Sequence, residues 1–578
     1  KYHAHRTVSF MPQRSNRYST TKNGKLFRQC SFFVSFTDDT TFFILRIEAK
    51  KGSMRKVTKE GNIMAADASR WPYKAHPINL KRGIYYGMLD LMGGGWNNIV
   101  SGVIFAYLTL AQGFNPAIAG GIAAAGRIVD CIWNLFLGLI TDNFYTTKLG
   151  QRFGRRHFFL VLGLILFTCV FPLFWISSTS WLYYLVVYVA MEIIIAMLIV
   201  PWECLPTEMT RDYKERTVLS GSRMVISSTG TAIVFIILAV LKQANNPNAY
   251  LVAGIAWTIL FVVAIAVSTF GTWERPITDE FIKEHENQPK MKVGEFVKNS
   301  VSEYAETFHN KAFRTHLAVY LLSFTGKDFY STLLPTFIVC CISGAGEGWP
   351  WTFQALSIIG IFVTIAATKL MVQRGPKFLF RLSYIGIIVA MIVYVSVYLM
   401  KIHNPFWIFI IASLVYQCGR ALLEFTPWNL FPFMPDVDYI MTRGDRAGLY
   451  ASVMTFFRKS TGAIATWIAG ILLEFTGYDA GTMKNYATTP AQVRFGITLI
   501  FFLGTVVMIA LALWLSNHIH LDADTHAVLK GEIERLENGG DKHDVTDEAR
   551  LVCEELTGHP YESLWPESVT TAPASANK

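Results

Sequence analysis

The stretch RIVDCIWNLFLGLITDNFYTTKLGQRFGRR, residues 127–156, joins a charged face of an apolar segment to a short basic connection. Arg127, Asp130 and Asn134 follow the spacing i, i+3, i+7, so a helix places them on one face. Charges inside a lipid-spanning helix are costly and are normally retained for a path through the membrane. The stretch therefore predicts a membrane helix with a polar pathway along one side.

The composition extends this interpretation to the whole chain. Of its 578 residues, 52% are hydrophobic and 16% are charged, whereas about a quarter of a soluble protein is charged. A run of about 20 apolar residues is long enough to cross a bilayer. Twelve such runs are expected, at 83–111, 116–141, 157–176, 181–206, 218–242, 249–271, 314–342, 350–372, 378–400, 405–433, 449–475 and 491–517.

These runs fall into two sets of six, which predicts an all-α membrane protein made of two six-helix bundles. Lys and Arg concentrate in the connections after segments 2, 4, 6, 8 and 10, so the positive-inside rule places both termini in the cytoplasm, most simply at the plasma (inner) membrane. The expected parts are an N-terminal extension, a first bundle, a cytoplasmic linker, a second bundle and a cytoplasmic tail, at 1–80, 81–271, 272–312, 313–517 and 518–578.

The net charge of +10 comes from the N-terminal extension. Residues 1–80 hold 15 Lys and Arg against 5 Asp and Glu, so the rest of the chain is neutral and nucleic acid is not an expected partner. Two interpretations stay open: a disordered leader, with Met54 or Met64 as the natural start, or a basic tail on an anionic leaflet. The eight cysteines include no CxxC pair, which argues against a disulfide framework or a zinc site.

Further ionisable residues fall inside the apolar segments. Candidates for a solute-binding pathway share this placement: Asp90, Trp96 and Asn97 in the first segment, Arg127 in the second, Glu203 between two prolines in the fourth, Arg223 in the fifth, Lys327 and Asp328 in the seventh, and Arg420 and Glu424 in the tenth. Lys327 and Asp328 are adjacent and do not face each other on a helix, so each needs another partner.

Structural alternatives exist for several of these residues. Arg127 and Asp130 could form an ion pair whose only role is to hold helices together. Glu203 could be exposed to water at a helix kink made by the two prolines. Arg420 and Glu424 could form an i, i+4 ion pair that needs no other partner. In the functional interpretation, Asp130 takes a proton or ligates Na⁺ directly. No nucleotide-binding, hydrolase or metalloprotease motif occurs at a credible place, so we expect no enzyme and no cofactor, only a coupling ion, H⁺ or Na⁺.

Four stretches resemble one known group. They are Tyr86 to Gly113, Arg127 to Arg156, Pro201 to Arg223, and Pro435 to Tyr439 followed by Phe456 to Lys459 and Gly462. Together they resemble the glycoside–pentoside–hexuronide:cation symporters of the major facilitator superfamily, from about Tyr86 to Trp514.

The resemblance implies roles for matching positions. Asp130 matches a cation-site carboxylate, Lys459 a lysine near that site, and Arg223 an arginine near the sugar. Asn134 stands where the melibiose carrier, the family's type member, has a second cation-site carboxylate.

The implied function is H⁺- or Na⁺-coupled symport of a sugar, glycoside or hexuronide by a monomer. Alternatives are a carrier of the same fold for a lysolipid or amino-acid derivative, or, from another class, a membrane enzyme or receptor.

Overall fold

A computed structural model describes residues 78–210, 213–274, 302–444 and 446–566. The described residues fold into helices and contain no strand. The N-terminal extension up to residue 77, most of the linker and the last twelve residues lie outside the described residues, so the expectations for them are not addressed.

The first half contains six membrane-spanning segments. The first segment is one long helix in pieces, in which two π-helical turns widen the backbone between the α-helical parts. Its pieces are α1 (Leu80–Gly87), α2 (Leu89–Asn98), η3 (Ile99–Val103), α3 (Ile104–Ala106) and η4 (Tyr107–Ala111). The other five segments are α4 (Pro116–Asn143), α6 (His157–Val170) with η6 (Phe171–Trp175), α7 (Trp181–Met209), α8 (Tyr213–Gln243) and α9 (Ala249–Gly271). A short helix, α5 (Lys148–Phe153), lies in the basic connection after α4.

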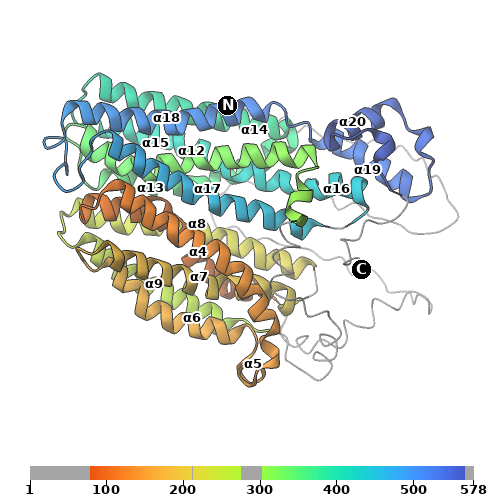
Figure 1. The fold of residues 1–578 in the computed structure, drawn as a ribbon, viewed down its shortest axis with the longest axis horizontal. Coiled ribbons are helices and arrows are strands. Elements are labelled where there is room, and N and C mark those ends of the chain that lie inside the picture. Colours follow the sequence, from red (N-terminus) through yellow and green to blue (C-terminus); the bar gives the residue numbers. More distant parts are fainter. Residues whose placement is uncertain (1–77, 211–212, 275–301, 445, 567–578) are drawn as a thin grey trace, which may run out of the picture. The chain divides into compact units, whose positions relative to one another are not determined.

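The second half also contains six segments, and Figure 1 shows the helices of each half running side by side. They are α12 (Lys311–Cys341), α13 (Trp349–Ala355) with η7 (Leu356–Ile359) and the first part of α14 (Gly360–Leu399), the second part of α14, α15 (Phe406–Leu430), α17 (Ala447–Phe475) and α18 (Ala491–Ser516). Gly375, at φ 74°, breaks α14 into its two spans. This positive φ favours glycine because it has no Cβ.

The twelve expected segments therefore coincide with helices to within a few residues. Eight helical stretches of the described residues are long and apolar enough to cross a membrane by length and composition alone, and one of them, Trp349–Leu399, holds two spans. The three segments that do not meet this standard are the first segment, α12 and α17. The first segment carries Asp90, α12 carries Lys327 and Asp328, and α17 carries Lys459. These candidate pathway residues lower the hydrophobicity of the three segments.

The two ends of the helices differ in the charge of their connections. One end holds α5, the interruption of α14 at Gly375 and the connection at Arg446, and we call it the basic end. We call the opposite end the neutral end. At the neutral end, polar contacts join the two halves: Lys242 Nζ lies 2.9 Å from Glu347 Oε2, and Asn115 Nδ2 donates to Glu474 Oε1 at 2.8 Å. The halves are thus tied together at the neutral end.

Helices α4 and α17 pack closely against each other near the neutral end. A Cβ built on Gly120 of α4 would lie 2.9 Å from the carbonyl oxygen of Thr466, and one on Gly470 of α17 would lie 2.3 Å from that of Pro116. Small residues allow helix backbones to approach this closely in membranes. The contact between the halves there depends on both glycines.

The chain after α18 folds against the basic end of the second half. Helices α19 (Ala523–Glu537) and α20 (Asp547–Thr557) lie beside α16 (Met434–Thr442) (Figure 1). His526 Nε2 lies 2.7 Å from Asp436 Oδ2, and Tyr439 donates to Glu537 at 2.9 Å. The sequence predicts a short amphipathic helix from His526 to Leu536, which lies within α19, and it predicts no helix at α20.

Candidate functional site

Asp130 lies at the contact between the two halves. Its carboxylate is almost fully buried, and Oδ2 lies 2.7 Å from Lys459 Nζ of α17. Asn134, one turn further along α4, donates its amide to Oδ1 at 2.8 Å. The three residues expected to form the coupling site are therefore brought together. The structural alternative, in which Asp130 pairs with Arg127, does not occur, because Asp130 forms its ion pair with Lys459 of the other half.

Arg127 instead faces Glu192, a residue that the sequence reasoning missed. The two side chains are 3.8 Å apart, and Trp96 Nε1 lies 3.4 Å from Glu192 Oε2 as a donor. Glu192 is 1% exposed, and its Oε1 has no hydrogen-bond partner within the described chain. It is also within electrostatic reach of Asp130. A signal was available, because Glu192 is the one Asp, Glu, Lys or Arg residue before Glu203 in the apolar run 181–206.

The adjacent residues Lys327 and Asp328 have separate partners, as expected from helix geometry. Arg458 of α17 binds Asp328 with two nitrogens, at 2.7 and 2.9 Å, in a bidentate pair. The Arg458 guanidinium also lies over the ring of Phe324, 4.7 Å from its centroid. The pairing of Arg458 with Asp328 was not predicted from the sequence.

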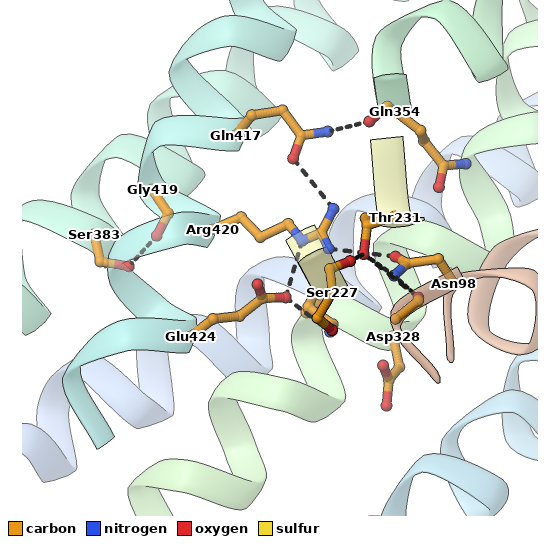
Figure 2. A network of polar contacts seen from close by, with 12 residues as sticks. Asn98, Ser227, Thr231, Asp328, Gln354, Ser383, Gln417, Gly419, Arg420 and Glu424 are labelled. Carbon is orange, nitrogen blue, oxygen red and sulfur yellow. Dashed lines mark hydrogen bonds and ion pairs between the residues drawn. The ribbon is translucent and has the colours of Figure 1, made fainter. Parts of the chain in front are cut away.

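Lys327, Arg420 and Glu424 form a cluster that we call the basic-excess triad. Figure 2 shows Arg420 and Glu424 with Gln417 and Asn98. Glu424 Oε1 accepts from both Lys327 Nζ and Arg420 Nε at 3.0 Å. Arg420 further donates to Gln417 at 3.4 Å and to Asn98 of the first half at 3.3 Å. The i, i+4 pair of Arg420 and Glu424 exists, but it is one part of a network that links the halves.

Asp90, Arg223 and Glu203 form a second cluster, which we call the acidic-excess triad. Arg223 Nε donates to Asp90 Oδ2 and Nη2 donates to Glu203 Oε1, both at 2.9 Å. The guanidinium lies over the ring of Trp202, 4.6 Å from its centroid. The side chain of Glu203 is 47% exposed, so this carboxylate is accessible while Asp90 is largely covered.

A Trp ring beside an Asn amide could form a platform for a sugar, but Trp96 and Asn97 are not arranged in this way. Trp96 is buried, because its ring packs against Phe171 and Tyr188 with centroids 6.0 Å away. Asn97 is exposed, and the neighbouring Asn98 takes the polar role by contacting Arg420 and Thr231. Adjacent residues of a helix point in directions about 100° apart, so Asn98 can reach these partners while Asn97 faces away.

Two further ionic clusters lie at the basic end, one in each half. Glu208 of α7 accepts from both Arg155 and Arg156 of the basic connection. In the second half, Asp438 of α16 accepts from Arg446 at 2.6 Å and from Tyr450 at 2.8 Å. The quoted motifs at 150–156 and 435–439 therefore supply ion pairs within each half.

Helices with mid-membrane ion pairs between two six-helix halves define a membrane transporter rather than an enzyme. The chain belongs to the family described as MFS/sugar transport protein, whose model matches residues 85–523. Its fold is that of the major facilitator superfamily. A crystal structure of a D-xylose–proton symporter matches at a TM-score of 0.51 with 13% identity, covering 75% of this chain and 97% of that one.

Three relatives show the range of the similarity. An uncharacterized symporter of Synechocystis is 21% identical over 70% of this chain and 87% of its own length. The sodium-dependent lysophosphatidylcholine symporter 1 of Xenopus tropicalis is 22% identical over 69% of this chain and 79% of its own. The raffinose carrier protein of Pediococcus pentosaceus is 26% identical over 32% of this chain and 29% of its own.

Proposed function

We propose that this transporter is a symporter in which Asp130 takes the coupling ion, H⁺ or Na⁺, while a solute binds between the halves. The symporter relatives support cation coupling. The single observation that carries the assignment of the coupling site is the buried pair of Asp130 with Lys459, because it joins one half to the other in the middle of the membrane segments.

A cation at Asp130 would compete with Lys459 for the same carboxylate. Proton or Na⁺ binding would therefore release Lys459 and weaken the contact between α4 and α17. A ligand that binds one conformation better than another shifts the equilibrium between them, and the linkage is reciprocal. Glu192 supplies a second carboxylate in electrostatic reach of Asp130, in place of the acidic residue that Asn134 replaces.

The positive-inside rule places the basic end in the cytoplasm at the plasma (inner) membrane. With the halves tied together at the neutral end, the structure corresponds to a conformation closed toward the outside. The basic-end ion pairs of Glu208 and Asp438 lie within their own halves, so they do not hold the halves together. The transporter is expected to work as a monomer.

The family description favours a sugar, glycoside or hexuronide as the solute. A non-sugar solute such as a lysolipid is the second candidate. It is favoured by the lysophosphatidylcholine symporter, whose similarity covers more than twice as much of this chain as that of the raffinose carrier. The many ionic groups between the halves also suit a charged solute better than a neutral one.

Uptake by proteoliposomes that contain the full chain tests the proposal. With labelled sugars and lysolipids, an imposed Na⁺ or pH gradient should drive accumulation of at least one probe. Asp130→Asn should abolish accumulation yet retain exchange of labelled for unlabelled solute, because binding of the solute itself is not removed. Asp524→Asn, on an exposed position of α19, is the matched control. Normal accumulation by Asp130→Asn would exclude Asp130 as the coupling site.

A further inference from the structure

The ionic groups of the membrane segments are unevenly compensated. Three acidic residues have one basic partner each: Asp130 with Lys459, Asp328 with Arg458, and Glu192 with Arg127. The two triads depart from this rule in opposite directions. The acidic-excess triad has two carboxylates for one guanidinium, and the basic-excess triad has two cations for one carboxylate.

In the basic-excess triad, Lys327 is the cation with spare capacity. Arg420 uses Nε, Nη1 and Nη2 on Glu424, Gln417 and Asn98. Lys327 has three N–H donors, and Glu424 Oε1, its acceptor among the described residues, is the same oxygen that Arg420 uses. A buried charge without a full partner is costly. An anionic group placed here would complete the compensation of Lys327.

The acidic-excess triad has the opposite imbalance, with one more negative charge than positive charge. Arg223 is shared by Asp90 and Glu203, so one negative charge has no cation of its own. Glu203 is the accessible member, since nearly half of its side chain is exposed. A cationic group would complete the compensation here.

Both triads meet the first membrane segment. Asp90 belongs to the acidic-excess triad, and Asn98 binds Arg420 of the basic-excess triad. Eight residues separate them, which is about 12 Å along a helix at 1.5 Å per residue. Between them, Gly94 packs on α8, where an added Cβ would lie 2.3 Å from the carbonyl oxygen of Ser227. The first segment thus contacts one member of each triad, Arg223 through Asp90 and Arg420 through Asn98.

We propose that the solute is dipolar, with an anionic group that binds at Lys327 and Arg420 and a cationic group that binds at Glu203 and Asp90. This inference rests on the proposed symport and names the solute class within it. A neutral sugar would leave both surplus charges uncompensated, and a purely anionic or purely cationic solute would leave one of them.

The test is competition for gradient-driven uptake by the full chain in proteoliposomes. The competing probes are glycerophosphocholine, which is dipolar and has no acyl chain, lysophosphatidylcholine, which is dipolar and has one, glycerol 3-phosphate as the anion, choline as the cation and raffinose as the neutral sugar. The two dipolar probes distinguish a soluble solute from a lipid one. We expect at least one dipolar probe to compete roughly tenfold better than the other three.

Two variants should change selectivity in opposite directions. Lys327→Gln removes the surplus positive charge and should shift the preference toward choline, whereas Glu203→Gln should shift it toward glycerol 3-phosphate, each by roughly tenfold. Lys484→Gln and Glu534→Gln are exposed controls that should not change the preference. A structural role for the two residues would lower all uptake without opposite shifts.

The outcomes separate the two proposals. If no gradient drives uptake of any probe, the symport proposal is wrong. If a gradient drives uptake but raffinose competes as well as the dipolar probes, or if both variants shift the preference in the same direction, symport stands and the dipolar solute is excluded. Binding of a coupling cation alone at Glu203 would appear as a changed ion dependence in Glu203→Gln with an unchanged order of probes, which also overturns the inference.

Discussion

Asp130 and Lys459 form a 2.7 Å ion pair whose two members belong to different halves of the molecule. The Asp130 side chain is buried but the Lys459 side chain is 29% exposed, so removing one partner should cost less than the about 3–5 kcal/mol that is typical of a fully buried pair. We expect Asp130→Asn and Lys459→Gln each to lower the thermal unfolding temperature in detergent. The double variant should be more stable than the sum of the two effects predicts, because neither charge remains. Additive losses would show that the two residues are not coupled.

The bidentate pair of Arg458 with Asp328 predicts that lysine cannot replace this arginine. Lysine offers a point charge and not a planar fork, so Arg458→Lys should lose roughly 1.5–3 kcal/mol, the contribution of one hydrogen bond to a charged group. Chemical unfolding in detergent measures this loss. Arg374→Lys is the control, because Arg374 lies over the ring of Phe378 and forms no ion pair among the described residues. Equal losses in both variants would contradict a specific role for the fork.

The close packing of α4 on α17 predicts that Gly120→Val prevents closure of the neutral end. The added side chain would meet the backbone at Thr466, so the halves must separate there. Uptake should fall at least about tenfold while the protein remains folded, since overpacking typically costs only 1–3 kcal/mol. A cysteine at the buried Ala480, in a Cys169→Ser background, should then react faster with an impermeant maleimide.

The matched control for this glycine is Gly221→Val, where an added Cβ would meet no atom within 4 Å. It should leave both uptake and the reactivity at position 480 unchanged. If Gly120→Val transports normally, the neutral end does not close by this contact.

The hydrogen bonds of Glu532 predict that the stability of the folded C-terminal helices depends on pH. Burial opposes ionisation, but hydrogen bonds from Arg535 and Tyr561 outweigh it and hold the pKa of Glu532 below its usual range. The ionised form therefore stabilises the folded state above the unfolded pKa of about 4.3, and this contribution is lost as the pH falls through the lower folded value. Limited proteolysis between pH 7 and pH 3 should show this loss in the wild type. Glu532→Gln should be less stable at pH 7 and should change less with pH.

The sequence could predict the fold in detail because each membrane segment is a long apolar run bounded by polar connections. Its ends follow from local signals, such as Asn115 and Pro116 at the start of α4 and the non-helical Gly375 within α14. Helix α20 escaped prediction because it is short and its apolar residues face a partner that only the tertiary structure supplies.

The candidate site could be predicted only in part. Polarity inside apolar runs identified most of its members, including Asp130 and Asp328, and the family resemblance added Lys459. Their partners could not be predicted, because pairing between helices depends on the rotation of each helix against its neighbours. The sequence therefore offered Arg127 as one alternative partner of Asp130, whereas Arg127 faces Glu192 of α7 in the structure.

The three segments with the lowest apolar character, namely the first segment, α12 and α17, have a consequence for biogenesis. A span that carries ionised side chains enters hydrocarbon at a cost of about 2.5–3.5 kcal/mol for each such residue near its centre. These segments cannot rely on lipid alone while the chain emerges from the ribosome. They are expected to stay at the translocon until a later helix brings the opposite charge, so that α12 leaves together with α15 and α17, the helices that bring Glu424 and Arg458.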